Sequence, residues 1–141
     1  MEIEKAYGAK GTIYLQSNLD MEELCQYLNT KLGISMSTDT DMDPPHTLFA
    51  YNAGEGGIEY SLYYNDTIKR EDYQYEFRLM TGELEFEQLH KRVYDLSLWF
   101  ARLVALACEI KTLAVRSVGK AGQVYSYDDK ILKVTCNIET L

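Results

Sequence analysis

Hydrophobic and polar residues alternate with a period of two along consecutive stretches in the middle of the chain. The clearest stretch is residues 73–80, where aromatic and aliphatic residues alternate with polar ones, as in a strand with one buried face. Residues 47–52 and 58–64 are also strand-like, and turns containing Gly, Asn and Asp separate the three runs. We therefore expect an antiparallel meander.

Shorter runs near both ends of the chain also favour strands. Residues 1–16 are predicted to form a hairpin of two short strands around a turn at residues 8–11, which begins and ends with glycine. Towards the C-terminus, glycine-containing and aspartate-containing turns separate strands predicted near residues 113–118, 124–127 and 131–138.

A first helix is marked at both of its ends. Asp20 is expected to cap the N-terminus, Glu23 follows three residues later, and Gly33 stands where a left-handed helix stop is expected. Leucines that share one face of this helix are Leu24, Leu28 and Leu32. The next residues, 34–47, are polar and contain two adjacent prolines, so we expect a surface loop there.

The strongest periodic signal predicts a long second helix over residues 83–110, because hydrophobic residues recur there at intervals of three and four. The side chains expected to pack against the sheet are Phe86, Val93, Phe100 and Leu103. The C-terminal half of the helix is apolar nearly all round and should be covered on more than one side. Arg102 interrupts this apolar run, which falls short of the ~20 residues that a bilayer requires.

Runs of strands interrupted by two helices, without regular alternation of strand and helix, indicate an α+β fold. We expect a mainly antiparallel sheet with the long second helix packed on it. No repeat or long linker divides the 141 residues, and this length suits one hydrophobic core. The sequence therefore predicts a single α+β domain over residues 1–141.

The net charge of the chain limits the kinds of binding partner that it can attract. The chain has 14 Lys and Arg against 22 Asp and Glu, for a formal net charge of -8. Such a field repels nucleic acids and anionic membranes and attracts a basic protein partner. We therefore predict no nucleic acid and no membrane among the partners, while the oligomeric state stays open.

Three cysteines lie far apart in apolar stretches, where free thiols usually act as small buried hydrophobes: Cys25, Cys108 and Cys136. The first residues are acidic and lack the positive and apolar regions of a signal peptide. These features predict a cytoplasmic protein in a reducing compartment.

No motif for catalysis or metal binding is complete. Asp39, Asp41 and Asp43 begin like a calcium loop, but Pro44 stands where that loop needs glycine and Ala50 where it needs glutamate. Neither of the two histidines has a second ligand at zinc-site spacing. We therefore expect no cofactor, no metal and no enzymatic activity.

Tyrosine is unusually frequent, with 12 residues. Tyrosine is enriched at binding surfaces because it covers a large area with little rotamer entropy, although it also favours strands for structural reasons. Several tyrosines lie close to carboxylates that the pattern places in loops and turns. The residues predicted to bind a partner are Asp39, Asp41, Asp43, Tyr63, Tyr64, Asp66, Glu71 and Asp72.

In its small size, negative charge and lack of catalytic groups, the chain resembles the small acidic immunity proteins that protect bacteria from their own toxins. Many of those toxins are nucleases with basic active-site clefts. The resemblance concerns the character of the whole chain and carries over no residue assignment. It implies a protein-binding inhibitor that neutralises a basic toxin.

Two other functions stay open. A small-molecule-binding or enzymatic domain would place its pocket between the sheet and the second helix, using a convergent set of polar residues. An inhibitor that mimics a nucleic acid would spread its charge along an elongated surface, whereas the immunity hypothesis favours one compact acidic patch.

Overall fold

The computed structural model describes residues 8–39, 49–52, 58–68, 71–81, 93–114, 121–128 and 131–140. Two helices lie within these residues, α1 (Met21–Leu32) and α2 (Ser97–Cys108). The strands there are β1 (Gly8–Leu15), β2 (Ser37–Asp39), β3 (Phe49–Asn52), β4 (Ile58–Tyr64), β5 (Tyr75–Thr81), β6 (Val93–Asp95), β7 (Thr112–Ala114), β8 (Ala121–Asp128) and β9 (Ile131–Thr140).

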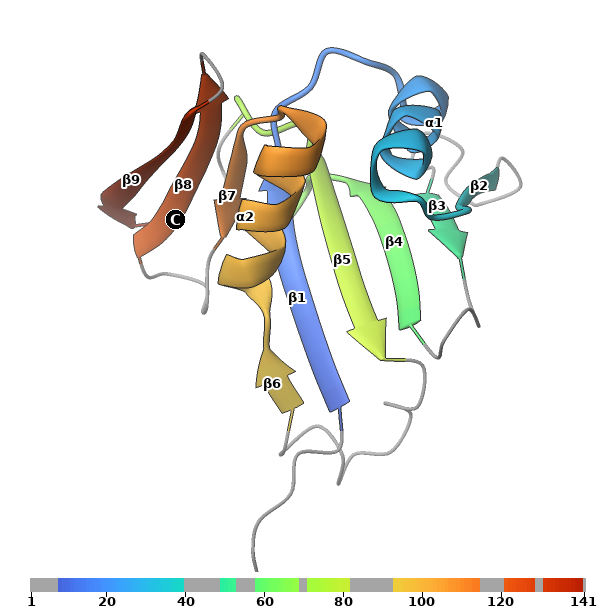
Figure 1. The fold of residues 1–141 in the computed structure, drawn as a ribbon, viewed down its shortest axis with the longest axis horizontal. Helices are drawn as coiled ribbons and strands as arrows, with labels where there is room; N and C mark the ends of the chain where they lie inside the picture. The colour runs from blue at the N-terminus through green and yellow to red at the C-terminus, as the bar shows by residue number, and fades with distance from the viewer. Residues whose placement is uncertain are drawn as a thin grey trace, which may run out of the picture.

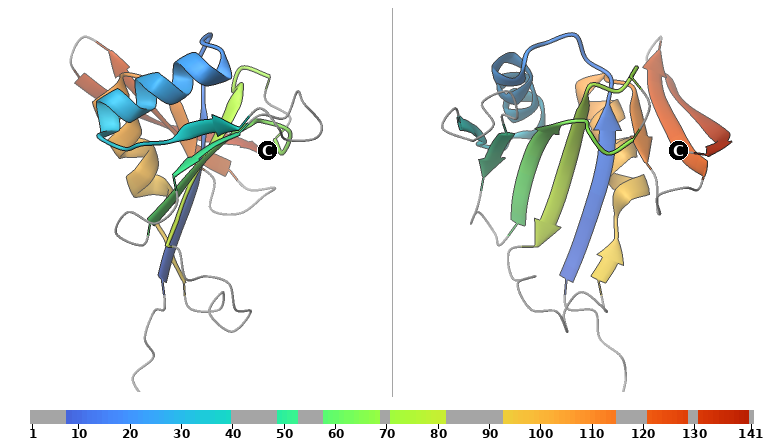
Figure 2. Two further views of the ribbon diagram at one scale, coloured as in Figure 1. Left: turned by 90° about the vertical axis from the view of Figure 1, so that its right-hand side faces the viewer. Right: turned by 180° about the vertical axis from the view of Figure 1, so that it is seen from behind.

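These strands form one sheet, and both helices lie on the same face of it (Figures 1 and 2). The strand order is β2-β3-β4-β5-β1-β7-β8-β9, and β6 pairs with the first residues of β1. Neighbouring strands are antiparallel except for β1 and β6. α2 lies against β1, β7 and β8. The predicted α+β fold, with a mainly antiparallel sheet and the second helix packed on it, is therefore confirmed.

The predicted meander is present as β3, β4 and β5. β4 pairs with β5 along its whole length, with Leu62 opposite Phe77, and both side chains are buried beneath the helices. Phe77 also packs against Phe100 of α2, with ring centroids 5.0 Å apart. The alternation in the sequence thus identified the face that the helices cover.

The chain passes closely over β1 where β6 leads into α2. The Leu96 N–H donates to the Lys10 carbonyl at 2.7 Å, and a Cβ on Gly11 would lie 3.3 Å from the Leu96 carbonyl carbon. The Ser97 Oγ accepts a hydrogen bond from the Thr12 N–H at 3.0 Å. Gly11 therefore allows the close approach, and Ser97 supplies the acceptor for this part of β1.

The main core lies between the helices and the sheet. Its fully buried larger side chains include Ile13, Leu15, Met21, Leu24, Leu28, Leu62, Phe77, Phe100 and Val104. A smaller cluster on the helix-free face consists of Tyr14, Ile68, Tyr73, Leu113 and Val124. Because Ile68 and Tyr73 belong to the connection between β4 and β5, that connection packs across one end of the helix-free face.

Two predictions for the first part of the chain are wrong. Residues 8–11 form part of the continuous strand β1, so they are no hairpin turn, and residues 1–7 lie outside the described part. The glycine at position 11 serves the close approach of Leu96 instead. The predicted loop over residues 34–47 contains β2, which pairs with β3, while residues 40–48 are not described.

The extent of the second helix was also predicted wrongly. Val93 belongs to β6, α2 begins at Ser97, and residues 82–92, including Phe86, lie outside the described part. Phe100 is buried as expected, but Leu103 is 38% exposed. The break at Asp95 explains the start, since its carboxylate accepts from the Ser97 N–H at 2.9 Å and from the Ser97 hydroxyl at 2.6 Å.

The three C-terminal strands exist as predicted, with different bounds. β7 begins one residue earlier than expected, and residues 115–120 after it lie outside the described part. β8 and β9 are longer than expected and pair with each other over most of their length. β9 forms one end of the strand order.

Candidate functional site

The connection between β4 and β5 is held by the side chain of Asn65. Its Oδ1 accepts from the Thr67 and Ile68 N–H groups at 3.1 Å each, while its Nδ2 donates to the Tyr73 carbonyl at 2.8 Å. The Asn65 N–H also donates to the Gln74 carbonyl at 2.9 Å. An asparagine that replaces backbone partners in this way fixes the shape of a turn.

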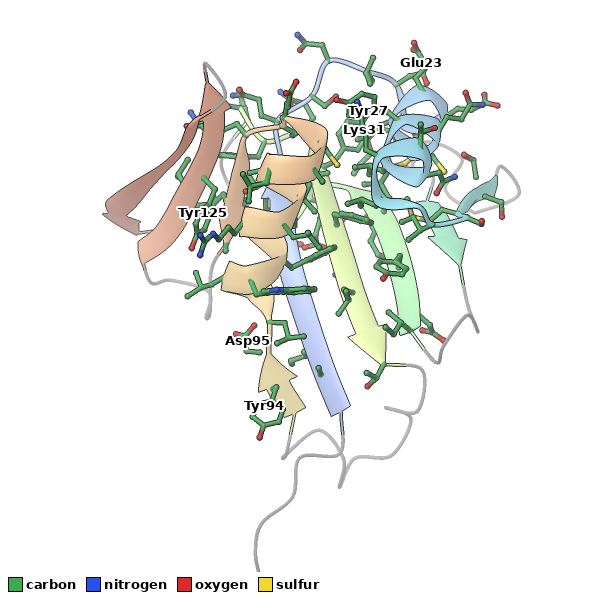
Figure 3. All side chains as sticks on the ribbon, viewed as in Figure 1. Glu23, Tyr27, Lys31, Tyr94, Asp95 and Tyr125 are labelled. Carbon is green, nitrogen blue, oxygen red and sulfur yellow. The ribbon has the colours of Figure 1, made fainter. Side chains whose placement is uncertain are left out.

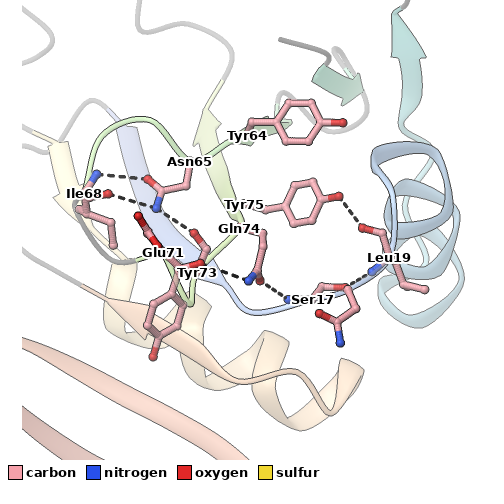
Figure 4. A pocket seen from close by; sticks show the side chains of 10 residues that line it. Ser17, Leu19, Tyr64, Asn65, Ile68, Glu71, Tyr73, Gln74 and Tyr75 are labelled. Atoms are coloured by element: carbon pink, nitrogen blue, oxygen red, sulfur yellow. Dashed lines mark hydrogen bonds between the residues drawn. The ribbon is translucent and has the colours of Figure 1, made fainter. Parts of the chain in front are cut away.

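Gln74 ties this connection to the segment between β1 and α1. Its Oε1 accepts from the Ser17 N–H at 2.9 Å, and its Nε2 donates to the Glu71 carbonyl at 3.3 Å (Figure 4). An open pocket of about 860 Å³ lies between the two segments. Its lining residues are Ser17, Asn18, Leu19, Tyr64, Asn65, Ile68, Glu71, Tyr73, Gln74 and Tyr75.

Two stacked tyrosines form an aromatic wall of this pocket. The rings of Tyr64 and Tyr75 have centroids 5.4 Å apart and an interplanar angle of 26°. The Tyr75 hydroxyl donates to the Leu19 carbonyl, which fixes the inner ring (Figure 4). Tyr64 is less buried than Tyr75, so its ring is the one that a bound molecule can reach.

Negative charge surrounds the aromatic pair. Burial is the main cause that raises the pKa of Tyr75 to about 12, and the neighbouring Tyr64 and the carboxylates of Asp20 and Glu23 add to this effect. Asp20 accepts a hydrogen bond from the Glu23 N–H at 2.8 Å, which holds the Asp20 pKa below its usual value. The start of α1 therefore places ionised carboxylates near the pocket at neutral pH.

The structure brings part of the predicted site together. Tyr64 and Glu71 both line the pocket, and Asp66 is exposed in the same connection, where Asp72 is half-buried. Tyr63 lies on the helix-free face instead, with the Arg78 guanidinium 4.7 Å from its ring centroid. The two adjacent tyrosines thus serve different faces of the sheet, as successive residues of a strand must.

The other predicted residues lie apart from the pocket or outside the described part. Asp39 is the last residue of β2, while Asp41 and Asp43 are not among the described residues. Within the connection itself, Lys69 and Arg70 stand between Ile68 and Glu71 in the sequence and are not described. Because these two basic residues offset part of the negative charge of the connection, the carboxylates at the start of α1 also contribute to the negative charge near the pocket.

Several residues of the pocket were missed at the sequence level. Ser17 and Leu19 belong to a segment without periodicity, and Gln74 and Tyr75 belong to a strand pattern that a structural role explains completely. Asp20 and Glu23 were recognised as a helix start but not as neighbours of Tyr75. Only the long-range pairing of β1 with β5 brings these segments together.

A second polar cluster lies on the helix-free face around Glu76. This carboxylate is 2% exposed, and the Arg78 Nε and Nη2 donate to its Oε2 at 2.8 and 2.6 Å. Burial, then the charge of Glu76 and a hydrogen bond with it, raise the pKa of Tyr14 to about 12. Glu76 thus has partners on two strands, which suits a structural link between β1 and β5.

The described cysteines do not suit thiol chemistry. Burial raises the pKa of Cys108 to about 12 and raises that of Cys25 as well, so both thiols stay protonated at neutral pH. The described residues contain no group of three or more His, Cys, Asp or Glu side chains that could hold a metal. Nor does either described helix have the length and apolar character needed to cross a bilayer.

No protein-family model, no curated protein and no solved structure matches this chain. The resemblance to immunity proteins therefore stays a prediction, and the geometry and charge of the pocket carry the functional argument.

Proposed function

We propose that this protein is a binding module for a basic protein partner and acts as an inhibitor of that partner. The observation that supports this most directly is the open pocket, whose aromatic wall of Tyr64 and Tyr75 lies near carboxylates from two separate segments. Glu71 is the charged residue among the pocket's lining residues. A lysine or arginine of a partner finds there both an aromatic face and negative charge.

The two features of the pocket have different roles in binding. Carboxylates near the rim, such as Asp66 and Glu71, accelerate encounter with a basic surface because the attraction acts over a distance. The partly buried ring of Tyr64, which is the more accessible of the two, adds a rigid contact that slows dissociation. The hydrogen bonds of Asn65 and Gln74 hold the pocket in shape before binding, so less conformational entropy is lost on association.

The partner that fits the whole-chain character best is a toxin with a basic active-site cleft. An acidic protein of 141 residues can block such a cleft without catalysis of its own, as immunity proteins do. The net charge of -8 supports this choice, and the carboxylates near the pocket support the pocket as the binding site.

The decisive experiment is co-expression with a toxin domain encoded beside this gene, followed by binding kinetics of the purified pair. We expect protection of the host cell and an association rate that falls as the salt concentration rises. Tyr64→Ala should chiefly speed dissociation, with a loss of about 1 to 4 kcal/mol in binding free energy if the ring is a hot spot. Glu71→Gln should chiefly slow association.

Glu59→Gln is the matched control for Glu71→Gln. It removes the same charge, but Glu59 lies five residues before Tyr64 on β4, about 17 Å away along the strand. Absence of binding or protection would refute the inhibitor function. Binding that is equally sensitive to Glu59→Gln and Glu71→Gln would keep the function and refute the pocket as its site.

Small-molecule binding is a second candidate, because a volume of about 860 Å³ lies within the usual range of ligand pockets. A small organic cation such as arginine amide would use the same aromatic and acidic groups. Titration of the labelled protein with arginine amide, followed by NMR, distinguishes the two functions. Saturable millimolar or tighter shifts at Tyr64 without any protein partner would favour this second candidate.

A further inference from the structure

The outer side of α2 exposes large hydrophobic side chains. Trp99 is 53% exposed, Leu103 38% and Leu106 44%, and we call these residues the α2 stripe. No described element lies across this side of the helix (Figure 1). α2 contacts both the sheet and α1, so the helix is covered on more than one side as expected, yet this stripe stays in water. Large exposed apolar side chains that share one side of a helix favour an interaction site there.

The spacing of the α2 stripe is that of a helix–helix seam. Trp99, Leu103 and Leu106 are separated by four and then three residues, which matches alternating d and a positions of a heptad. A helix that packs on a sheet needs a broader apolar face, and α2 already has one on its inner side, around Phe100 and Val104. The outer stripe is therefore a second, narrower contact surface that suits another helix.

We propose that the α2 stripe binds the same stripe of a second copy of this chain, as an antiparallel pair of helices related by a two-fold axis. In an antiparallel seam, a positions lie opposite d positions, so Leu103 of each copy lies opposite Leu106 of the other. The contact is self-complementary, as a closed two-fold dimer requires.

The charges that flank the seam agree with this arrangement. Arg102 and Glu109 are both exposed. Glu109 is the C-cap of α2, one residue past the last helical residue, so its Cα lies seven positions after Arg102 on the same flank of the stripe. In the proposed register, Arg102 of one copy is offset from Glu109 of the other by two residues, about 3 Å along the axis. The same flanks meet in an antiparallel pair, so both copies form an opposite-charge contact.

A parallel pair of helices lacks this complementarity. There, each g position faces the e position that follows in the other copy, so Arg102 would face the uncharged Ala107. Both the hydrophobic register and the charge pattern thus select the antiparallel arrangement. This proposal concerns a surface other than the pocket and does not depend on the proposed function.

The contact is small, so the dimer should be weak. A helix of 12 residues is about 18 Å long, which gives fewer layers than stable coiled coils have. Tyr94, which is 67% exposed in β6, extends the apolar surface beyond the N-terminal end of α2 (Figure 3). We expect a dissociation constant on the order of micromolar, as for small transient interfaces.

The test is sedimentation velocity of the full chain from about 1 to 500 micromolar, a range chosen to bracket a weak interface. Fluorescence follows the same samples, because Trp99 is the single tryptophan of the chain and reports directly on the stripe. We expect a monomer–dimer equilibrium and a blue shift of Trp99 emission over the same concentrations. Leu106→Glu should weaken the dimer about a hundredfold, since it buries a charge in the seam.

Charge-reversal variants distinguish a specific dimer from nonspecific hydrophobic association. Arg102→Glu and Glu109→Arg should each weaken the dimer about threefold to tenfold, and the double variant should restore it. Lys31→Glu on α1 is the control and should leave the dimer unchanged. A monomer at every concentration, a dimer that tolerates Leu106→Glu, or a double variant without recovery would each overturn the proposal. A monomer whose Trp99 is already shielded would also overturn it, because the occupant would then belong to the same chain.

Discussion

α1 and α2 are both 12 residues long and lie on the same face of the sheet, yet their outer sides differ in chemistry. The exposed residues of α1 are Glu22, Glu23, Gln26, Thr30 and Lys31. Those of α2 are Trp99, Arg102, Leu103 and Leu106. α1 therefore needs only the core beneath it, whereas α2 leaves apolar surface in water unless it meets a further partner.

The two helices also differ in how their ends are capped. α1 begins with the side-chain cap of Asp20 and ends at Gly33, whose φ of 69° suits glycine. The N-cap of α2 is Leu96, which makes no side-chain hydrogen bond, and its C-cap is Glu109, a non-glycine residue with φ of 55°. The residues at its own caps therefore mark both bounds of α1, whereas the N-cap and C-cap residues of α2 are not typical capping residues.

The largest effect is expected from Phe100→Ala, which tests the inner side of α2. Phe100 is 1% exposed and packs against Phe77, so its removal should lower the free energy of unfolding by about 3 to 5 kcal/mol. Leu103→Ala is the matched change on the outer side and should cost less than about 1 kcal/mol in the monomer. Chemical denaturation at low protein concentration measures both. Equal losses would mean that α2 has no distinct inner and outer sides.

This contrast explains how much of the fold the sequence could predict. The bounds of α1 and the meander follow from caps and alternation, which depend on neighbours along the chain. The start of α2 does not, because the hydrophobic period continues through Val93, whereas the pairing of β6 with β1 and the Asp95 hydrogen bonds to Ser97 delay the helix until Ser97. A period of three and four residues does not reveal which apolar side chains stay in water.

The same limit applies to the candidate site. Tyr64 and Glu71 were predicted because aromatic and acidic residues adjoin in the sequence. Ser17 and Gln74 could not be predicted, since they meet across 57 positions through one hydrogen bond. Tyr63 was grouped with Tyr64 by proximity, although strand geometry sends successive side chains to opposite faces.

The second prediction concerns the close passage of the chain into α2. Gly11→Ala places a Cβ 3.3 Å from the Leu96 carbonyl carbon, and backbone atoms move less easily than a flexible side chain. We expect a loss of about 1 to 3 kcal/mol in the free energy of unfolding, as for other overpacked sites. Amide exchange at Leu96 should also quicken, because its hydrogen bond to the Lys10 carbonyl is disturbed. Unchanged amide exchange at Leu96 would show that the loss of stability in Gly11→Ala does not come from this contact.

A third prediction has the opposite sign. Glu109→Gly relieves a left-handed backbone conformation that glycine adopts easily, and should raise the free energy of unfolding of the monomer by about 0.5 to 1 kcal/mol. Glu109→Ala, which keeps the strain, should give no such gain. In the dimer proposed above, both variants lose the contact with Arg102, so both should associate more weakly. Glu109→Gly should therefore raise the free energy of unfolding of the monomer and at the same time weaken association. A loss of stability in that variant would show that Glu109 holds the end of α2 through its side chain.

The smallest expected effect lies at the start of α1. The Asp20 pKa is lowered in the folded chain by the Glu23 N–H, so ionised Asp20 stabilises the fold above its unfolded pKa of about 3.9. This contribution is lost as the pH falls through the lower folded pKa. Asp20→Asn keeps a cap that accepts the same hydrogen bond but does not titrate. The melting temperature of the original chain should therefore exceed that of Asp20→Asn at pH 7, and the difference should shrink below about pH 4. Asp66→Asn, at an exposed position outside the helices, serves as the control for general charge effects. A difference that stays constant from pH 7 to pH 2.5 would show that the charge of Asp20 contributes nothing to the stability of α1.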